Sequence, residues 1–127
     1  MKDTPPIIKE IGFDFHWSEE KVWKLDAPVS DMEIGELLWH FDIPFLDDGY
    51  KCYALTPRAV MEYPERYQKE YARMQRADRK WPLDIMENKG RWLLLDGLHR
   101  LMQAYILGEQ KIKVRIIPRE RIPEITR

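Results

Sequence analysis

Residues 92–108 read WLLLDGLHRLMQAYILG, an apolar run that is interrupted by polar and small residues and then resumes. The unbroken segment from Trp92 to Leu95 is typical of a strand covered on both faces, so it predicts a central strand. The residues after it place apolar side chains on one face of a helix that Gly108 would end, at Leu98, Leu101, Met102, Tyr105 and Ile106. This stretch therefore predicts a buried strand that turns through Asp96-Gly97 into a helix.

The segments on either side of this stretch predict the rest of a sheet. Leu83 to Glu87 and Arg91 to Leu95 flank the loop Asn88-Lys89-Gly90, whose final glycine favours an antiparallel hairpin. After the helix, Ile112, Val114 and Ile116 alternate with Lys111, Lys113 and Arg115, as in a strand with one solvent-exposed face. Strand, helix and strand in succession form a βαβ unit, and we expect its two strands to run parallel.

The region before the hairpin predicts a short strand and several helices. Val22 to Leu25 is the expected strand, and Ser30 with Glu33 resembles a capping box ahead of a helix with Ile34, Leu37, Leu38 and Phe41 on its buried side. Thr56-Pro57 starts a second helix, which Pro64 interrupts. Residues 65–78 are helical again, with a narrow stripe of Tyr67, Tyr71 and Met74. Such a stripe is more often core than ligand site.

The fold class expected from these patterns is α/β (α+β) with a mixed sheet. A β-hairpin is followed by a βαβ unit, and helices pack on the sheet. Residues 21–127 form the single domain, since 127 residues with 44% hydrophobic content suit one core. Residues 1–20 form an arm that packs Phe13, Phe15 and Trp17 on the body.

The composition argues against a disulfide-bonded, zinc-binding or membrane protein. Cys52 is the only cysteine, and His16, His40 and His99 lack metal-ligand spacing, so we expect neither a disulfide nor a zinc site. No long apolar segment opens the chain, and we expect a cytoplasmic protein without membrane association. Residues 1–54 carry 5 basic and 12 acidic residues, whereas residues 55–127 carry 16 and 10. This asymmetry favours a basic face for an anion or self-association as a homo-oligomer, unless it is only a solvated face.

The motif DGLHR, residues 96–100, carries the chemistry that the sequence suggests. Backbone N–H groups at a helix start lack intrahelical partners, and with the helix dipole they bind phosphate. Gly97 lets the backbone approach a ligand, Arg100 offers a planar fork of donors, and His99 can donate a hydrogen bond or move a proton. The candidate binding residues are Asp96, Gly97, Leu98, His99 and Arg100.

Each of these residues also has a purely structural interpretation. Asp96 is a favoured helix cap, Gly97 suits the turn, and His99 and Arg100 are common on exposed helix faces. The charge of Asp96 repels a bare phosphate unless a cation such as Mg²⁺ lies between them. The catalytic residue stays open, with Asp96 and His99 as candidates. Three acids on or near the first long helix, Glu33, Glu36 and Asp42, are not brought to the motif by any pattern.

Pro82 to Ile117 resembles the core of the ParB/sulfiredoxin-like superfamily, which includes the ParB N-terminal domain and the ParB-like nuclease domain. The resemblance covers about 36 of the 127 residues and rests on a hairpin followed by a D-G-x-H-R motif at a helix start. It implies a sulfiredoxin-like fold whose phosphate-binding loop is 96–100. It also implies a nucleotide, with Mg²⁺ where phosphoryl transfer occurs, as the cofactor or ligand.

The chain departs from two branches of that superfamily. Sulfiredoxins have a cysteine where this chain has Leu98, so reduction of sulfinic acids is not expected. Partition proteins continue into a helix-turn-helix domain, whereas only ten residues follow Ile117, which argues against sequence-specific DNA binding.

Three functions stay open after this comparison. The first is a phosphotransferase or nuclease acting at the DGLHR motif. The second is a non-catalytic module whose nucleotide occupancy changes a partner surface, through Arg66, Arg73 and Arg76. The third is an interaction domain without a ligand.

Overall fold

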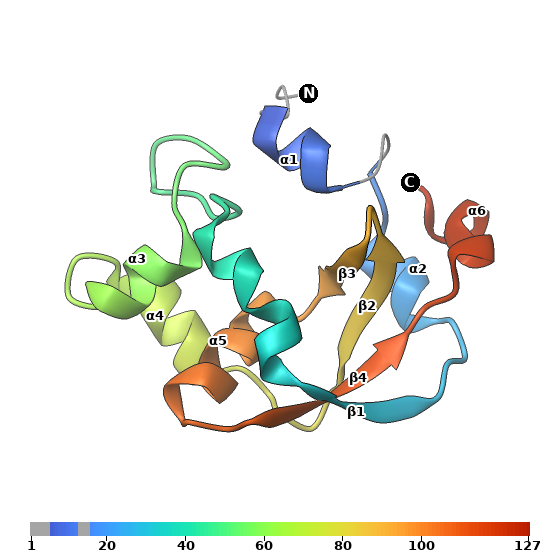
Figure 1. Cartoon of the computed structure of the whole chain (residues 1–127). Helices are drawn as coiled ribbons and strands as arrows, with labels where there is room; N and C mark the ends of the chain where they lie inside the picture. The colour runs from blue at the N-terminus through green and yellow to red at the C-terminus, as the bar shows by residue number, and fades with distance from the viewer. Residues whose placement is uncertain (1–5, 13–15) are drawn as a thin grey trace.

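A four-stranded mixed sheet lies at the centre of the computed structural model, which describes residues 6–12 and 16–127 (Figure 1). The strand order is β1-β4-β2-β3, with β2 antiparallel to β3, β4 parallel to β2 and β1 antiparallel to β4. The strands are β1 (Val29–Glu33), β2 (Leu83–Asn88), β3 (Arg91–Asp96) and β4 (Lys111–Ile116). The predicted mixed α/β class is therefore confirmed.

The predicted hairpin is present between β2 and β3. Asn88 pairs with Arg91, so the loop itself contains only Lys89 and Gly90. Both loop residues have positive φ, 51° for Lys89 and 81° for Gly90. This conformation matches the right-handed twist of the two strands, and glycine adopts it without a steric penalty.

The order of the strands corrects the predicted βαβ unit. Helix α5 (Leu98–Ile106) connects β3 to β4, but β2 lies between these two strands. Because β4 is parallel to β2, it is antiparallel to β3, and the prediction that the strands flanking α5 run parallel is wrong. The parallel crossover starts at β2 and contains both β3 and α5. Every residue of β2 except Glu87 is buried, so β2 is the strand that both layers of helices cover.

Strand β3 lies at the edge of the sheet, which corrects its predicted central position. Its outer edge is covered by the 3-10 helix η1 (Ile34–Asp42). The buried side chain of His40 accepts a hydrogen bond through Nε2 from Leu94 N at 2.9 Å, and its Nδ1 lies 2.8 Å from Leu37 O. An imidazole thus occupies the place of a neighbouring strand, which protects the open edge.

Helices cover both faces of the sheet (Figure 1). Helices α3 (Pro57–Glu62), α4 (Gln68–Gln75) and α5, together with η1, surround the larger core, whose central side chains include Leu37, Phe41, Met74, Leu83, Ile85, Leu101 and Met102. Helices α2 (Glu19–Trp23) and α6 (Ile122–Ile125) cover a smaller core, which contains Val22, Met86, Leu93, Leu95, Ile117 and Ile125. Helix α1 (Pro6–Ile11) lies at the hairpin end, and η2 (Arg119–Arg121) precedes α6.

Two local predictions in the first third are wrong. The segment expected as a strand at Val22 belongs to α2, which Ser18 caps by accepting a hydrogen bond from Lys21 N. Ser30 is not a helix cap, because it lies in β1 opposite Val114. Pairing with β4 supplies hydrogen bonds along the whole segment, and this tertiary interaction overrides the local capping pattern.

Other local predictions are confirmed. Ile34, Leu37 and Phe41 are buried on one side of η1, and the Thr56 hydroxyl accepts from Ala59 N at the start of α3. The helix predicted over 65–78 is shorter, spanning Gln68–Gln75, with Met74 buried.

Among residues 6–12 and 16–127, every helix is too short or too polar to span the hydrocarbon layer of a membrane.

Only part of the predicted N-terminal arm, residues 1–20, lies within the residues that the structure describes. Trp17 packs on the smaller core and donates from Nε1 to Leu95 O at 2.9 Å, as an arm that packs on the body would require. Phe13 and Phe15, the other two aromatic residues of that prediction, lie outside the described residues.

Candidate anion-binding site

The start of α5 is shaped by a close contact between Gly97 and β2. Gly97 is the N-terminal cap residue with φ of 113°, and a β-carbon built there would lie 2.4 Å from Leu83 Cδ2. The Gly97 backbone therefore packs closely against Leu83 in the core and is not simply an exposed turn. Because glycine has no side chain to accept the first N–H groups of α5, these groups have no side-chain cap. The turn expected at Asp96-Gly97 is present, and the structure adds that its glycine is left-handed and that the helix start has no side-chain cap.

The predicted apolar face of α5 is buried only over its first two turns. Leu101 and Met102 are fully buried, and Leu98 packs partly buried against the larger core. Leu98 is therefore a packing residue in the candidate motif. Tyr105 and Ile106, predicted in the same buried stripe, are 41% and 44% exposed, and in this last turn the small side chain of Ala104 is the buried one.

Asp96 and Arg100 form an ion pair one helical turn apart. Arg100 Nη2 lies 2.8 Å from Asp96 Oδ2, and Arg100 Nη1 donates to Pro82 O at 2.6 Å. Asp96 Oδ2 also accepts from Trp23 Nε1 at 2.7 Å. Asp96 therefore orients Arg100 and does not cap the helix. A guanidinium has five N–H donors, so the two bonds given by Arg100 leave donors for a ligand.

His99 forms a hydrogen bond with an acid that the sequence did not indicate. Its Nε2 lies 2.7 Å from Glu70 Oε2, and the other oxygen of Glu70 lies 3.2 Å from Arg73 Nη1. The carboxylate acceptor favours the tautomer with the proton on Nε2. Nδ1 then carries the lone pair, and it makes no hydrogen bond within the part of the chain that the structure describes. Such a His–Glu pair is the usual arrangement of an oriented base.

A surface cavity of about 270 Å³ lies where α4 and α5 meet. Its lining brings together residues from the motif and from the end of α4: Arg73, Arg76, Ala77, Asp78, His99 and Arg100. The lining contains three guanidinium groups and the carboxylate of Asp78, and two of the guanidinium groups, those of Arg73 and Arg100, are already paired with Glu70 and Asp96. Arg76 is exposed and makes no ion pair among the residues that the structure describes. These features suit a small anion with several oxygen acceptors.

The residues at the cavity do not form a binding site for a metal ion that the protein would hold without a ligand. Among residues 6–12 and 16–127, no group of three or more His, Cys, Asp or Glu residues could hold a metal. Glu70 and Asp96 are already bound by cationic or N–H groups. The site therefore leaves a Mg²⁺ ion few open oxygen ligands. The expected Mg²⁺ would have to arrive with a nucleotide, and this stays a prediction.

The acids singled out by the sequence lie away from the motif. Asp42 pairs with Arg58 at 2.6 Å, while Glu33 and Glu36 are exposed on β1 and η1. The acid that does reach the motif, Glu70, precedes His99 by 29 positions. The only sequence signal for it was its place on the helix of Tyr67, Tyr71 and Met74, whose packing side could not be matched to α5 from periodicity alone.

Comparisons with protein-family models, with curated proteins and with solved structures found no match for this chain. The resemblance to the ParB/sulfiredoxin-like superfamily therefore stays an expectation, and the geometry of the site carries the functional argument.

Proposed function

We propose that the cavity between α4 and α5 binds the phosphate group of a nucleotide or of another phosphorylated small molecule. The observation that carries the proposal is the convergence of Arg73, Arg76 and Arg100 on one cavity beside the uncapped start of α5. Guanidinium forks and free helix N–H groups are the two donor types that proteins use most for phosphate. Asp96 does not oppose binding, because its charge is balanced by Arg100.

The proposal includes an acid–base step at His99. With Nε2 held by Glu70, Nδ1 can accept a proton from a water or hydroxyl group that attacks the phosphorus atom. A P–O bond forms to the attacking oxygen, the P–O bond to the leaving group breaks, and the leaving oxygen takes a proton from solvent water. The three arginines would stabilise the charge that gathers on the phosphoryl oxygens. This chemistry is that of a phosphotransferase or nuclease.

The finer features of the fold and setting belong to the same proposal. We place the domain with the ParB/sulfiredoxin-like proteins because the hairpin leads into a helix that begins at DGLHR. A cytoplasmic location is consistent with the one cysteine, Cys52, and with a nucleotide ligand. A homo-oligomer is also consistent with the uneven charge of the two halves, and sedimentation at two ionic strengths tests it.

Calorimetric titration with a nucleoside triphosphate and with pyrophosphate, each with and without Mg²⁺, tests the binding step. Arg76→Ala is the informative variant, because Arg76 has no structural partner among the described residues. We expect affinity to fall by about tenfold or more, as for the loss of one charge-assisted contact. Equal affinity of Arg76→Ala and the original chain would refute the site.

Arg100→Ala is a less specific variant than Arg76→Ala. The substitution takes the donor from Pro82 O and the ion-pair partner from Asp96, which keeps only the hydrogen bond from Trp23, so it should lower stability as well as binding. Arg100→Lys keeps the charge but not the fork, so comparing the two variants separates charge from geometry.

Turnover separates the enzyme from the non-catalytic module. Release of phosphate or cleavage of a phosphodiester substrate, lost in His99→Gln with binding retained, would support the acid–base step. Binding with a thermal shift and no turnover would favour the nucleotide-responsive module. Absence of any shift would favour the interaction domain.

A further inference from the structure

Five exposed basic side chains lie on α4 and in the turns on either side of it, and two of them, Arg73 and Arg76, line the cavity. The five residues are Arg66, Lys69, Arg73, Arg76 and Lys80, which follow one another at separations of three and four positions. Lys69, Arg73 and the C-cap residue Arg76 share one face of α4 by this spacing, whereas Arg66 and Lys80 lie in the turns before and after the helix; all five residues are exposed. The opposite side of α4 is the one that buries Met74. We call these five residues the basic track.

Most charges of the basic track are not neutralised by the protein. Of the five basic-track residues, only Arg73 forms an ion pair with another described residue, Glu70, at 3.2 Å. Arg66 and Lys80 instead lie over the rings of Tyr67 and Trp81, at 5.7 Å and 5.0 Å from the ring centroids. Unpaired like charges in a row repel one another, so a surface of this kind favours an extended anion.

Exposed aromatic side chains lie at both ends of the basic track. Trp81 follows Lys80 and is 59% exposed, and Tyr63 precedes Arg66 and is 58% exposed. Pro82, next to Trp81, accepts the hydrogen bond of Arg100, so the indole belongs to the surroundings of the cavity. Both rings are open to solvent, and exposed aromatic rings are the surfaces on which nucleobases stack.

We propose that the basic track binds single-stranded nucleic acid without sequence preference and leads one phosphate of the strand into the cavity. The inference rests on the proposed function, because it assigns the phosphate in the cavity to a polymer. Arginine and lysine follow the backbone, and Trp81 and Tyr63 stack on bases. A duplex hides its bases from these rings. An acidic peptide would match the charges but would leave both aromatic rings unused.

Fluorescence anisotropy with a labelled oligothymidylate of about twelve nucleotides tests the track, since single-strand sites span roughly 4 to 16 nucleotides. The test variant is Lys69→Ala/Lys80→Ala, whose two residues lie outside the cavity lining. We expect affinity to fall by about tenfold or more at low salt. The slope of log affinity against log salt should fall by about 1.4, because each phosphate contact on a single strand contributes about 0.7.

The matched control is Lys51→Ala/Lys111→Ala, which removes the same charge from two exposed residues away from α4. It should leave the affinity within about twofold and the salt slope within about 0.7, the contribution of one contact. Trp81→Ala should lower affinity at least about fivefold, as for the loss of one stacked base, with little change in the salt slope.

Pyrophosphate titration on the same proteins separates this inference from the proposed function. Retained pyrophosphate binding in Lys69→Ala/Lys80→Ala, with loss of the oligonucleotide, supports the basic track. Pyrophosphate binding by the original chain without oligonucleotide binding would overturn the track and leave the phosphate cavity in place. If the original chain binds neither pyrophosphate nor the oligonucleotide, both the basic track and the phosphate cavity are overturned. Tighter binding of a duplex or of polyglutamate than of the single strand would also overturn the track.

Discussion

His99 Nε2 and Glu70 Oε2 lie 2.7 Å apart, although 29 positions separate the two residues in the chain. Their side chains are only 21% and 14% exposed, so the hydrogen bond is shielded from water on most sides. A shielded carboxylate holds an imidazole in one orientation and one tautomer, which leaves the second ring nitrogen available for proton transfer. This hydrogen bond also connects α4 to α5 at the edge of the cavity.

Glu70→Gln tests this pair directly. The amide can also accept through its oxygen, but as a neutral group it holds the Nε2–H tautomer less strongly. Proton-detected nitrogen NMR of the His99 ring should show mainly the Nε2–H tautomer in the original chain and a mixture in Glu70→Gln. In a phosphodiester or phosphoryl-transfer assay, kcat should fall by about 10²-fold or more. Affinity should not fall, because the substitution also releases the Arg73 guanidinium from its ion pair. Unchanged tautomer populations would contradict the assigned role of Glu70.

Burial of His40 predicts a dependence of stability on pH. Burial lowers the pKa of His40 to about 4, from an ordinary value of 6.5. The unfolded chain therefore binds a proton on this residue below about pH 6.5, while the folded chain resists protonation until about pH 4. The free energy of unfolding should fall by about 3 kcal/mol as the pH is lowered through this window.

His40→Gln provides the control for that prediction. Carboxyl groups also titrate in the lower part of the window, and burial raises the pKa of Asp84, whose effect has the opposite sign. Denaturant unfolding at about pH 4.5 and about pH 7 should therefore be compared between the two proteins. The variant should be less stable at neutral pH and should lose less stability on acidification. An equal loss in both proteins would show that His40 is not responsible.

Gly97→Ala should destabilise the fold strongly. A side chain at this position would combine a φ of 113° with a β-carbon 2.4 Å from Leu83 Cδ2. Strain and overpacking together should cost roughly 2 to 4 kcal/mol. Gly35→Ala is the matched control, because its β-carbon would have no neighbour within 4 Å. Thermal unfolding should show a large decrease for the first variant and a change of about 1 kcal/mol or less for the second.

Leu101→Ala tests the orientation of α5. Leu101 is fully buried in the larger core, so truncation should cost about 2 to 5 kcal/mol in denaturant unfolding. Leu107→Ala, at the exposed C-terminal end of the same helix, should change stability by less than about 0.5 kcal/mol. Similar effects of the two substitutions would mean that α5 packs through a different face.

The hairpin and the helix at DGLHR were predictable because their signals are local. Gly90 and Gly97 both adopt the positive φ that their turns require, and Leu101 and Met102 occupy the buried face that their spacing indicates. The strand order was not predictable in the same way. The apolar run from Trp92 to Leu95 suits a central strand, but it also suits an edge strand whose open side is covered by a helix.

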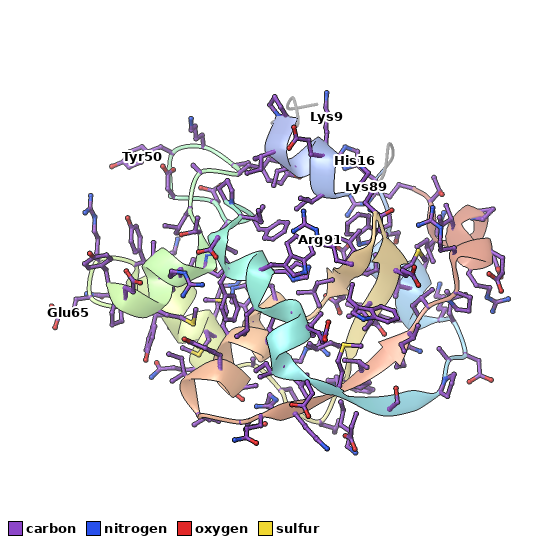
Figure 2. The ribbon with its side chains drawn as sticks, in the orientation of Figure 1. Lys9, His16, Tyr50, Glu65, Lys89 and Arg91 are labelled. Carbon is purple, nitrogen blue, oxygen red and sulfur yellow. The ribbon has the colours of Figure 1, made fainter. Side chains whose placement is uncertain are left out.

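Arg91 illustrates why the surroundings of β3 could not be predicted from its sequence. Figure 2 shows Arg91 between η1 and the hairpin, and its guanidinium lies 4.1 Å from the centroid of the Trp39 ring. Contact with a ring more than fifty positions away determines where this charged residue lies. In the same way, Arg76 was notable in the sequence only as a surface charge, yet it lines the cavity with Arg100.

The amino-acid sequence was sufficient to predict the elements whose geometry depends on a few neighbouring residues: the hairpin turn, the turn before α5, and the buried residues in the first turns of that helix. Backbone sterics and side-chain periodicity act over these short distances. Three features emerged from packing of the whole chain: β2 lies between β3 and β4, Glu70 reaches His99, and Arg73 and Arg76 line one cavity with Arg100. These outcomes depend on which apolar surfaces are buried together, and burial depends on the whole chain.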